Sequence, residues 1–348
     1  MESISQRKKD HIQICLTQNV QSAGNTTGLE AYRFIPEALP EIDFESIHTE
    51  TRFLHKPLKV PFIVSSMTGG TTEALQINRT LASAAEARGW GFGIGSVRAA
   101  LENPEVRSSF IVRDVAPTVP IFTNLGAVQL NYGYGVEQCR AALELLQADG
   151  IVLHLNSMQE IFQPEGDTNF SGLLEKIRVL CTQLEAPVGI KEVGFGIHGE
   201  LAAKLYEAGV AFVDVAGAGG TSWIEVEKHR AKDPQLQLAA DTFAEWGLPT
   251  ADCIVQARAC SPNGFLIASG GIHNGLHAAK TLALGADLCG FGRRLLEPAI
   301  EGEAALDKLM ARLEFELKAA MFGIGCKSLA ELKGTSKLVR TAPPPARA

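Results

Sequence analysis

The chain has 348 residues, of which 46% are hydrophobic and 20% charged, and its formal net charge is −7. This length and apolar content allow a large buried core, in two domains or in one large α/β barrel. The negative charge argues against a protein that coats nucleic acid or an anionic membrane through bulk electrostatics. Any anionic ligand must therefore be captured by local groups.

The chain shows no signal for export or membrane insertion. Its N-terminus lacks the apolar core of a signal peptide, and no window approaches the roughly 20 apolar residues of a membrane span. The seven cysteines include no CxxC pair, which favours buried free thiols over a zinc site or a catalytic thiol. These features predict a soluble, cytoplasmic protein.

The first 60 residues differ in pattern from the rest of the chain. A charged segment at 6–17 predicts a helix, and an extended stretch that contains prolines, IPEALPEIDF, follows it. We expect residues 1–60 to be an extension that covers one end of the main domain, 61–335. Residues 336–348 end in TAPPPARA, whose prolines predict a disordered tail.

Within the main domain, short apolar runs alternate with amphipathic segments, as in parallel strands joined by helical crossovers. Strands are predicted at 62–66, 91–95, 120–124, 150–154, 187–191, 211–215, 264–268 and 286–290. Helices are predicted at 72–88, 136–148, 172–184, 198–208, 249–259, 274–284 and 302–322, with a helix-poor connection at 95–119. Eight strand units favour a closed TIM (β/α)8 barrel over the runner-up, a doubly wound sheet.

Small and polar residues follow several of the predicted strands. The runs SSMTGG, GSVR, NLG and AGAGGTSW come after strands one, two, three and six. A single Gly-rich turn is more often an ordinary tight turn than a ligand loop. Several such turns around one barrel mouth, where glycine lets the backbone approach a ligand closely, favour a binding site there.

The most informative stretch is IVLHLNSMQE at 151–160. A buried apolar run leads directly into four polar residues, His154, Asn156, Gln159 and Glu160. Such a cluster at the end of a barrel strand is typical of a site for a polar substrate. A lone carboxylate beside amides suits a hard cation such as Mg²⁺ better than a metal that prefers thiolates.

Lys191 ends the otherwise apolar strand PVGIK, where a lysine that points into the barrel mouth is expected. It could form a Schiff base, hold a carboxylate or lie beside the pyrimidine edge of a flavin. The alternative is an ion pair with an acid on a neighbouring strand, for instance Asp214.

The last two barrel units predict a phosphate site. Ser269, Gly270 and Gly271 follow strand seven, and the run GFGRR at 290–294 follows strand eight. Backbone N–H groups of these two loops hold a phosphate in many barrels, and Arg293 or Arg294 could add positive charge. The alternative is a pair of simple turns, and the pattern does not say which phosphate is bound.

Taken in order, these motifs resemble the type 2 isopentenyl diphosphate isomerases, the FMN-dependent class, across nearly the whole chain. The matching runs are RKKDHI (7–12), SSMTGG (65–70), GSVR (95–98), NLG (124–126), HLNSMQE (154–160), IKEVGFGI (190–197), GAGGTSW (217–223), SGGI (269–272) and GFGRRLL (290–296). Any one of them is weak, but nine in the same order are highly specific.

The resemblance implies a barrel that interconverts isopentenyl and dimethylallyl diphosphate, with reduced FMN as acid and base, Mg²⁺ on the diphosphate, and NADPH or NADH as reductant. It implies flavin contacts at Ser66, Met67, Thr68, Ser96, Asn124, Lys191, Thr221, Gly270, Gly271, Gly292 and Arg293. It implies substrate contacts at Arg7, Lys8, His11, Ser96, Arg98, His154, Asn156 and Gln159, with Glu160 as the metal ligand. No side chain is assigned with certainty as the catalytic group. The family also implies a homo-oligomer, a tetramer or an octamer.

On general grounds the basic run at 7–11 would be a solvated helix start, and only the resemblance makes it a diphosphate site. It would then fold over its own barrel mouth or over that of a neighbouring subunit. Two other functions stay open. One is an FMN-dependent 2-hydroxy acid oxidoreductase, although GAGGTSW lacks the His and Arg that such enzymes place after a late strand; the other is a non-catalytic phosphate-binding barrel.

Overall fold

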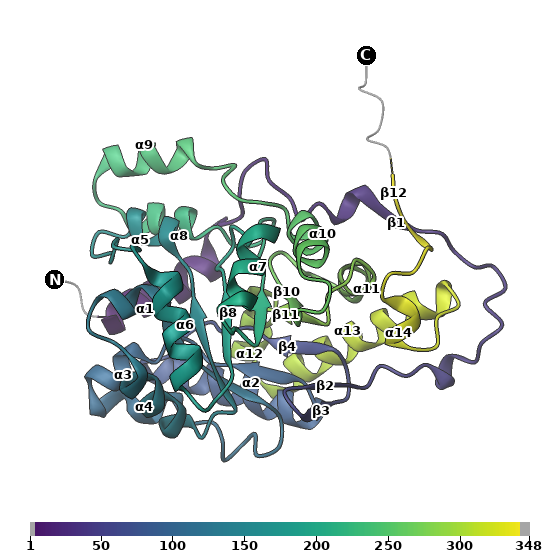
Figure 1. Ribbon diagram of the computed structural model, residues 1–348, viewed down its shortest axis with the longest axis horizontal. Helices are drawn as coiled ribbons and strands as arrows, with labels where there is room; N and C mark the ends of the chain where they lie inside the picture. Colours follow the sequence, from purple (N-terminus) through teal and green to yellow (C-terminus); the bar gives the residue numbers. More distant parts are fainter. Residues whose placement is uncertain (1–3, 342–348) are drawn as a thin grey trace.

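The structure is a computed structural model that describes residues 4–341. Eight parallel strands form a closed barrel surrounded by helices, which confirms the predicted TIM barrel (Figure 1). The barrel strands, each overlapping a predicted one, are β4 (Phe62–Val64), β5 (Gly91–Gly93), β6 (Ile121–Gly126), β7 (Gly150–His154), β8 (Val188–Lys191), β9 (Phe212–Asp214), β10 (Leu266–Ala268) and β11 (Leu288–Phe291). Consecutive strands are neighbours, and β11 closes the barrel against β4.

The predicted helices are present. They are α2 (Thr72–Arg88), α4 (Val136–Leu146), α6 (Leu173–Gln183), α7 (Gly199–Glu207), α10 (Thr250–Cys260), α11 (Gly275–Ala283) and α13 (Glu303–Gly323), and the N-terminal helix α1 spans Ile4–Thr17. Helix α2 shows why they form: the Thr71 side chain accepts a hydrogen bond from Ala74 N at its start, and Gly89 ends it with φ of 67°. None of the helices in the described residues could span a membrane.

Several short helices were not predicted. They are α3 (Arg98–Glu102), α5 (Ser157–Phe162), α8 (Trp223–Arg230), α9 (Pro234–Thr242), α12 (Leu296–Glu301) and α14 (Leu329–Leu332), with 3₁₀ turns η1 (Leu29–Ala31), η2 (Phe44–Ser46), η3 (Pro104–Phe110), η4 (Ala127–Asn131) and η5 (Arg293–Leu295). Helices α5 and α8 follow barrel strands β7 and β9 and contribute to the site described below.

The N-terminal extension reaches both ends of the barrel, whereas the sequence suggested one. Its hairpin, β2 (Thr51–Phe53) and β3 (Lys56–Leu58), places the fully buried Phe53 among residues inside the barrel. The Phe53 ring stacks on Phe265 at 4.8 Å and lies 4.9 Å from Phe122. Aromatic packing of this kind closes the amino-terminal end of the barrel, while α1 lies at the opposite end.

The expectation of a disordered tail from residue 336 was wrong for its first part. Strand β12 (Leu338–Arg340) pairs with β1 (Tyr32–Phe34) in an antiparallel ladder, which joins the middle of the extension to the segment that follows the barrel (Figure 1). A pairing between strands so far apart in sequence leaves no local pattern. Residues 342–348 lie outside the described part of the chain.

Candidate active site

A cavity of about 480 Å³ lies at the carboxyl ends of the barrel strands, next to α1. Every residue predicted as a ligand lines this one cavity. These residues are Arg7, Lys8, His11, Ser66, Met67, Thr68, Ser96, Arg98, Asn124, His154, Asn156, Gln159, Glu160, Lys191, Thr221, Gly270, Gly271, Gly292 and Arg293. Since they come from α1 and from loops after most of the strands, the fold gathers residues that are distant in sequence.

Helix α1 lies over the mouth of its own barrel. The Lys8 ammonium donates a hydrogen bond to Ser96 O (2.9 Å) and lies 4.9 Å from the centre of the Phe110 ring. Burial, followed by the charge of Arg7, lowers the pKa of Lys8 to about 7. The last turn of α1 is held by Arg293, whose Nε donates to Cys15 O at 3.0 Å.

At the end of β7, His154 is held as a neutral ring. Burial, and then the positive charges of Lys191, Lys8 and Arg7, lower the pKa of His154 to about 3. Its Nδ1 lies 2.8 Å from Asn124 Oδ1, so the neutral ring donates its proton to this carbonyl oxygen. His154 is thus suited to hydrogen bonding and not to carrying a positive charge.

The predicted metal ligand, Glu160, is buried on α5. Its carboxylate accepts hydrogen bonds from Asn156 Nδ2 (2.7 Å), Gln163 Nε2 (3.3 Å) and Asp167 N (2.7 Å). Burial raises the pKa of this carboxyl, and the hydrogen bonds oppose that rise. The described residues contain no group of three or more His, Cys, Asp or Glu side chains suited to hold a metal.

The oxygens around Glu160 nevertheless fit a hard cation that takes its remaining ligands from a bound diphosphate and from water. The Oδ1 atom of Asn156 is buried and has no hydrogen-bond partner among the described residues. An amide oxygen beside a carboxylate is a donor set that Mg²⁺ accepts, with waters and phosphate oxygens completing the octahedron. Arg98, which pairs at 2.8 Å with both Glu102 and Asp167, lies at the same edge of the cavity.

Lys191 has a different partner from the one considered from sequence. It lies beside Asp214 in the strand register, but no Lys191–Asp214 ion pair within 4.0 Å occurs in the described structure. Its ammonium instead donates to Glu192 O at 2.5 Å. Asp214 accepts a hydrogen bond from Ser269 Oγ at 2.6 Å, and burial raises the pKa of this carboxyl.

The two last strand loops form a cradle of backbone groups. Gly270 and Gly271 have φ of 98° and 70°, and a Cβ on Gly270 would lie 2.1 Å from Gly217 O. A Cβ on Gly292 would lie 3.9 Å from the nearest atom, Ser65 Cβ, which is an ordinary van der Waals contact. Ser65 Oγ, buried at the cavity wall, has no partner in the described residues. The cradle therefore fits the phosphate of a cofactor, with Arg293 and Arg294 both at its rim.

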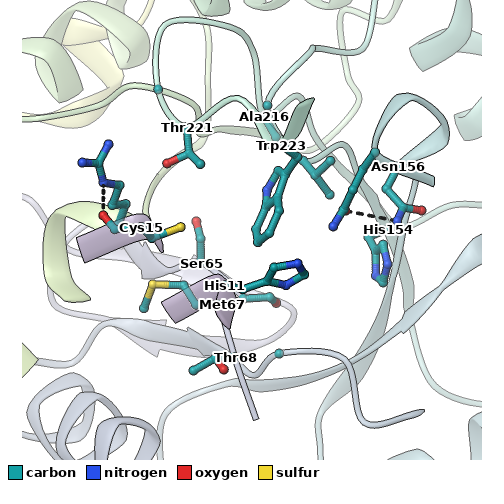
Figure 2. Close-up of a pocket in the computed structure, with 18 of the residues that line it drawn as sticks. His11, Cys15, Ser65, Met67, Thr68, His154, Asn156, Ala216, Thr221 and Trp223 are labelled. Carbon is teal, nitrogen blue, oxygen red and sulfur yellow. Dashed lines mark hydrogen bonds between the residues drawn. The ribbon is translucent and has the colours of Figure 1, made fainter. Parts of the chain in front are cut away.

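Two residues of the site, Trp223 and Glu227 of α8, were missed from sequence. The rings of Trp223 and the predicted ligand His11 meet edge to face, with centroids 5.0 Å apart and an interplanar angle of 71°, and Figure 2 shows both beside Met67 in the pocket. Behind them the fully buried Glu227 accepts a hydrogen bond from Gln159 (3.1 Å) and pairs with His11. Glu227 lies in the charged run EVEKHR, which by pattern is a solvated helix face, and only its four-residue spacing from Trp223 could have indicated a shared side.

Comparison with known proteins defines the class first. A family model described as FMN-dependent dehydrogenase matches residues 1–107 and 138–340, so the chain belongs to this class of barrel proteins. Among solved structures, a variant of mandelate oxidase with 2-hydroxy-phenylacetamide superposes with a TM-score of 0.67 at 19% identity, covering 97% of this chain and 98% of that one. At this low identity the likeness shows the shared fold alone.

Sequence relatives narrow the class. The chain is 54% identical over 337 residues to the isopentenyl-diphosphate delta-isomerase of Oceanobacillus iheyensis, with 97% of each chain covered. It is 49% identical over 334 residues to the protein of the same name from Nostoc sp., covering 96% and 95%. The chain therefore belongs to the isopentenyl-diphosphate delta-isomerase family, in its FMN-dependent type 2 form, as its motifs predicted.

Proposed function

We propose that this chain interconverts isopentenyl and dimethylallyl diphosphate with bound FMN in its reduced form and Mg²⁺ on the diphosphate. One observation carries the proposal: a single cavity joins two separate sites for anions. The Gly-rich cradle after β10 and β11 suits a cofactor phosphate, and the cations Arg7 and Lys8 of α1 and Arg98 of α3 line the same cavity. The names of the close relatives agree with this assignment.

The residues between the two anion sites fit a flavin ring and a small hydrocarbon. The ring would be surrounded by an apolar thioether and by polar side chains that line the cavity, those of Met67, Thr68, Asn124, Lys191 and Thr221. When bound, reduced FMN supplies a proton donor and acceptor beside the alkene. The chain's part is to place the diphosphate and to keep water away by means of α1.

The titratable side chains of the pocket support a mechanism in which a cofactor carries out the proton transfers. A 1,3-shift of a double bond adds a proton at one carbon and removes one at another, both on an unactivated hydrocarbon. His154, with a pKa near 3, is not an acid at neutral pH, and Glu160 is occupied by hydrogen bonds and assigned to Mg²⁺. Arg7, Lys8, His11, Ser96, Arg98 and Gln159 are assigned to the diphosphate, with His154 and Asn156 beside it.

The remaining expectations complete the proposal. The flavin would be reduced by NADPH or NADH, the protein would act in the cytoplasm, and it would form a tetramer or an octamer. Neither nucleic acid nor a membrane takes part. The extension 1–60, the barrel 61–335 and the closing segment are proposed to act as one unit, because α1 completes the substrate side of the cavity.

The strongest alternative is an FMN-dependent 2-hydroxy acid oxidoreductase, the activity suggested by the mandelate oxidase neighbours. Such an enzyme needs a base and a cation for the acid's carboxylate after a late strand. In this chain the loop after β9, residues 215–222, contains neither His nor Arg. A non-catalytic phosphate-binding barrel would have no reason to gather Gln159, Glu160 and Lys191 in one cavity.

The deciding experiment is an anaerobic incubation of the purified protein with reduced FMN, Mg²⁺ and isopentenyl diphosphate. Dimethylallyl diphosphate should appear, and omission of either cofactor should stop its formation. Bound flavin without product would refute the isomerase proposal, and oxidation of a 2-hydroxy acid would favour the alternative. A protein that stays colourless after addition of FMN would support the non-catalytic barrel.

A further inference from the structure

One buried carboxylate beside the cavity has no role in the chemistry above. It belongs to Glu192, the residue directly after β8. Its Oε2 accepts hydrogen bonds from four consecutive backbone N–H groups, those of residues 193–196, at 2.6, 2.6, 2.5 and 3.1 Å. A carboxylate held by several N–H groups is firmly oriented, and here it shapes the loop that supplies them.

On the barrel side, this loop determines the surroundings of Lys191. The Lys191 ammonium donates to the carbonyl oxygen of Glu192, and the peptide that carries this oxygen also carries the first N–H bound by the Glu192 carboxylate. The direction of the carbonyl, and with it the place of the ammonium, therefore depends on the carboxylate. Val193 and Gly194 of the same loop line the cavity.

On the outer side, the loop touches α5, which carries the proposed substrate ligand Gln159, and α8, which carries Glu227. Phe195 is buried in a cluster with Phe162 of α5 and Ile224 of α8. Gly194, with φ of 146°, packs so closely on the loop after β9 that a Cβ would lie 2.5 Å from Thr221 O. A shift of residues 193–196 would thus displace Lys191 on one side of the cavity and the packing of α5 and α8 on the other.

We propose that Glu192 is a positioning residue: its carboxylate folds residues 193–196 around itself, and so holds Lys191 at the flavin side and Phe195 against α5 and α8. This inference deepens the proposed function and rests on it, because Lys191 is assigned to the flavin. Glu192 also brings a negative charge next to Lys191. That charge offsets part of the positive potential that a flavin would meet at this edge of the cavity.

Two substitutions separate the hydrogen bonds from the charge. Glu192→Gln keeps a side-chain oxygen that can accept the four N–H groups but removes the charge, and Glu192→Ala removes both. Glu200→Gln, at an exposed position in the first turn of α7, is the matched control. Hydrogen exchange of amides 193–196, FMN affinity and the flavin reduction potential are measured for each holoprotein. Because burial raises the pKa of Glu192 to about 7, the measurements are made well above that pH, where the wild-type carboxyl is charged.

In Glu192→Ala the four amides should exchange about 100-fold faster and FMN should bind about tenfold more weakly, because hydrogen bonds to a charged acceptor are lost. Glu192→Gln should keep slow exchange, yet raise the flavin reduction potential, since the charge of Lys191 is then less offset and favours the more anionic reduced flavin. A purely structural role would leave the potential of this folded variant unchanged.

The outcomes distinguish this inference from the proposed function. If wild-type protein binds FMN and forms dimethylallyl diphosphate but both Glu192 variants match Glu200→Gln, the inference is wrong and the proposed function stands. If wild-type protein binds no FMN, the proposed function fails and the inference fails with it. If Glu192→Ala does not fold, the reduction potential of Glu192→Gln decides, and a value equal to that of the control overturns the inference.

Discussion

Nε2 of His11 lies 2.9 Å from Oε1 of Glu227, so a fully buried carboxylate of α8 fastens α1 over the barrel mouth. The same carboxylate pairs with Arg230 at 2.5 Å. Burial alone would raise the pKa of Glu227, but His11, Arg230 and Gln159 together hold it below its usual range. Glu227 is therefore a charged anchor inside the protein, and its partners lie on three different helices, α1, α5 and α8.

We expect Glu227→Ala to lower the free energy of unfolding by about 3 kcal/mol, because it takes a carboxylate away from the nearly buried guanidinium of Arg230. Folding lowers the pKa of Glu227. Its contribution to the free energy of unfolding is therefore complete above the ordinary pKa of a carboxyl group, and it is lost as the pH falls towards the pKa of Glu227 in the folded protein. Urea denaturation at neutral pH measures the loss. Glu165→Ala, which removes the more exposed partner of Arg230 at 3.1 Å, is the control and should cost less than about 1 kcal/mol. Equal losses in the two variants would contradict the anchoring role.

Glu160→Gln should weaken Mg²⁺-dependent binding of isopentenyl diphosphate by about tenfold or more, because an amide is a poor ligand for a hard dication. FMN affinity should hardly change. Since burial raises the pKa of Glu160, metal-dependent activity should decline on acidification at a higher pH than an ordinary carboxyl would give. Titration calorimetry with and without Mg²⁺ tests the first statement, and a loss of flavin affinity instead would show that the role is misassigned.

Substrate affinity should fall as pH rises above about 7, because Lys8 loses its proton there in the free protein and a diphosphate binds the protonated form more tightly. A Lys8→Arg variant stays protonated and should bind with an affinity that is flat from about pH 7 to about pH 9. Binding is measured with the reduced holoprotein and Mg²⁺ at constant ionic strength. An unchanged slope in Lys8→Arg would place the titrating group elsewhere.

Two of the glycines of the phosphate cradle, Gly270 and Gly292, should respond differently to alanine. Gly270→Ala must place a Cβ 2.1 Å from Gly217 O in a backbone of φ 98°, so we expect a loss of about 2–3 kcal/mol in stability together with loss of FMN. Gly292→Ala meets nothing closer than 3.9 Å and should fold normally. If a flavin phosphate approaches the backbone there, Gly292→Ala should weaken FMN binding alone. Thermal unfolding and flavin fluorescence separate the two effects, and equal melting temperatures for both variants would argue against the steric reasoning.

Local pattern was sufficient for the barrel and for placing a cavity at the carboxyl ends of its strands. Parallel strands that are buried on both faces appear as short apolar runs, and the Gly-rich and polar residues after them mark the carboxyl ends. Nineteen ligand positions could be assigned largely because the order of motifs resembles one family, and the structure brings all of them to one cavity. Their individual roles remain predictions.

What local pattern could not show depends on contacts between distant segments. The pairing of β1 with β12, the position of Phe53 inside the barrel and the burial of Glu227 all arise from residues that meet only in the folded chain. Helix α5 was missed because the polar ligand residues Gln159 and Glu160 occupy its first turn and obscure the helical periodicity. Helix α8 was missed because it is short and rich in charged residues, so its apolar residues give no clear stripe.

The ladder between β1 and β12 also has a consequence for how the protein folds as it is synthesised. Strand β1 leaves the ribosome before any barrel strand, yet its partner β12 follows only after all eight of them. The barrel strands can associate with their neighbours in sequence as they appear, whereas this ladder requires the closure of a loop nearly as long as the chain. The middle of the N-terminal extension is therefore secured late in assembly, so a nascent chain that stops before β12 would carry all eight barrel strands with β1 still unpaired.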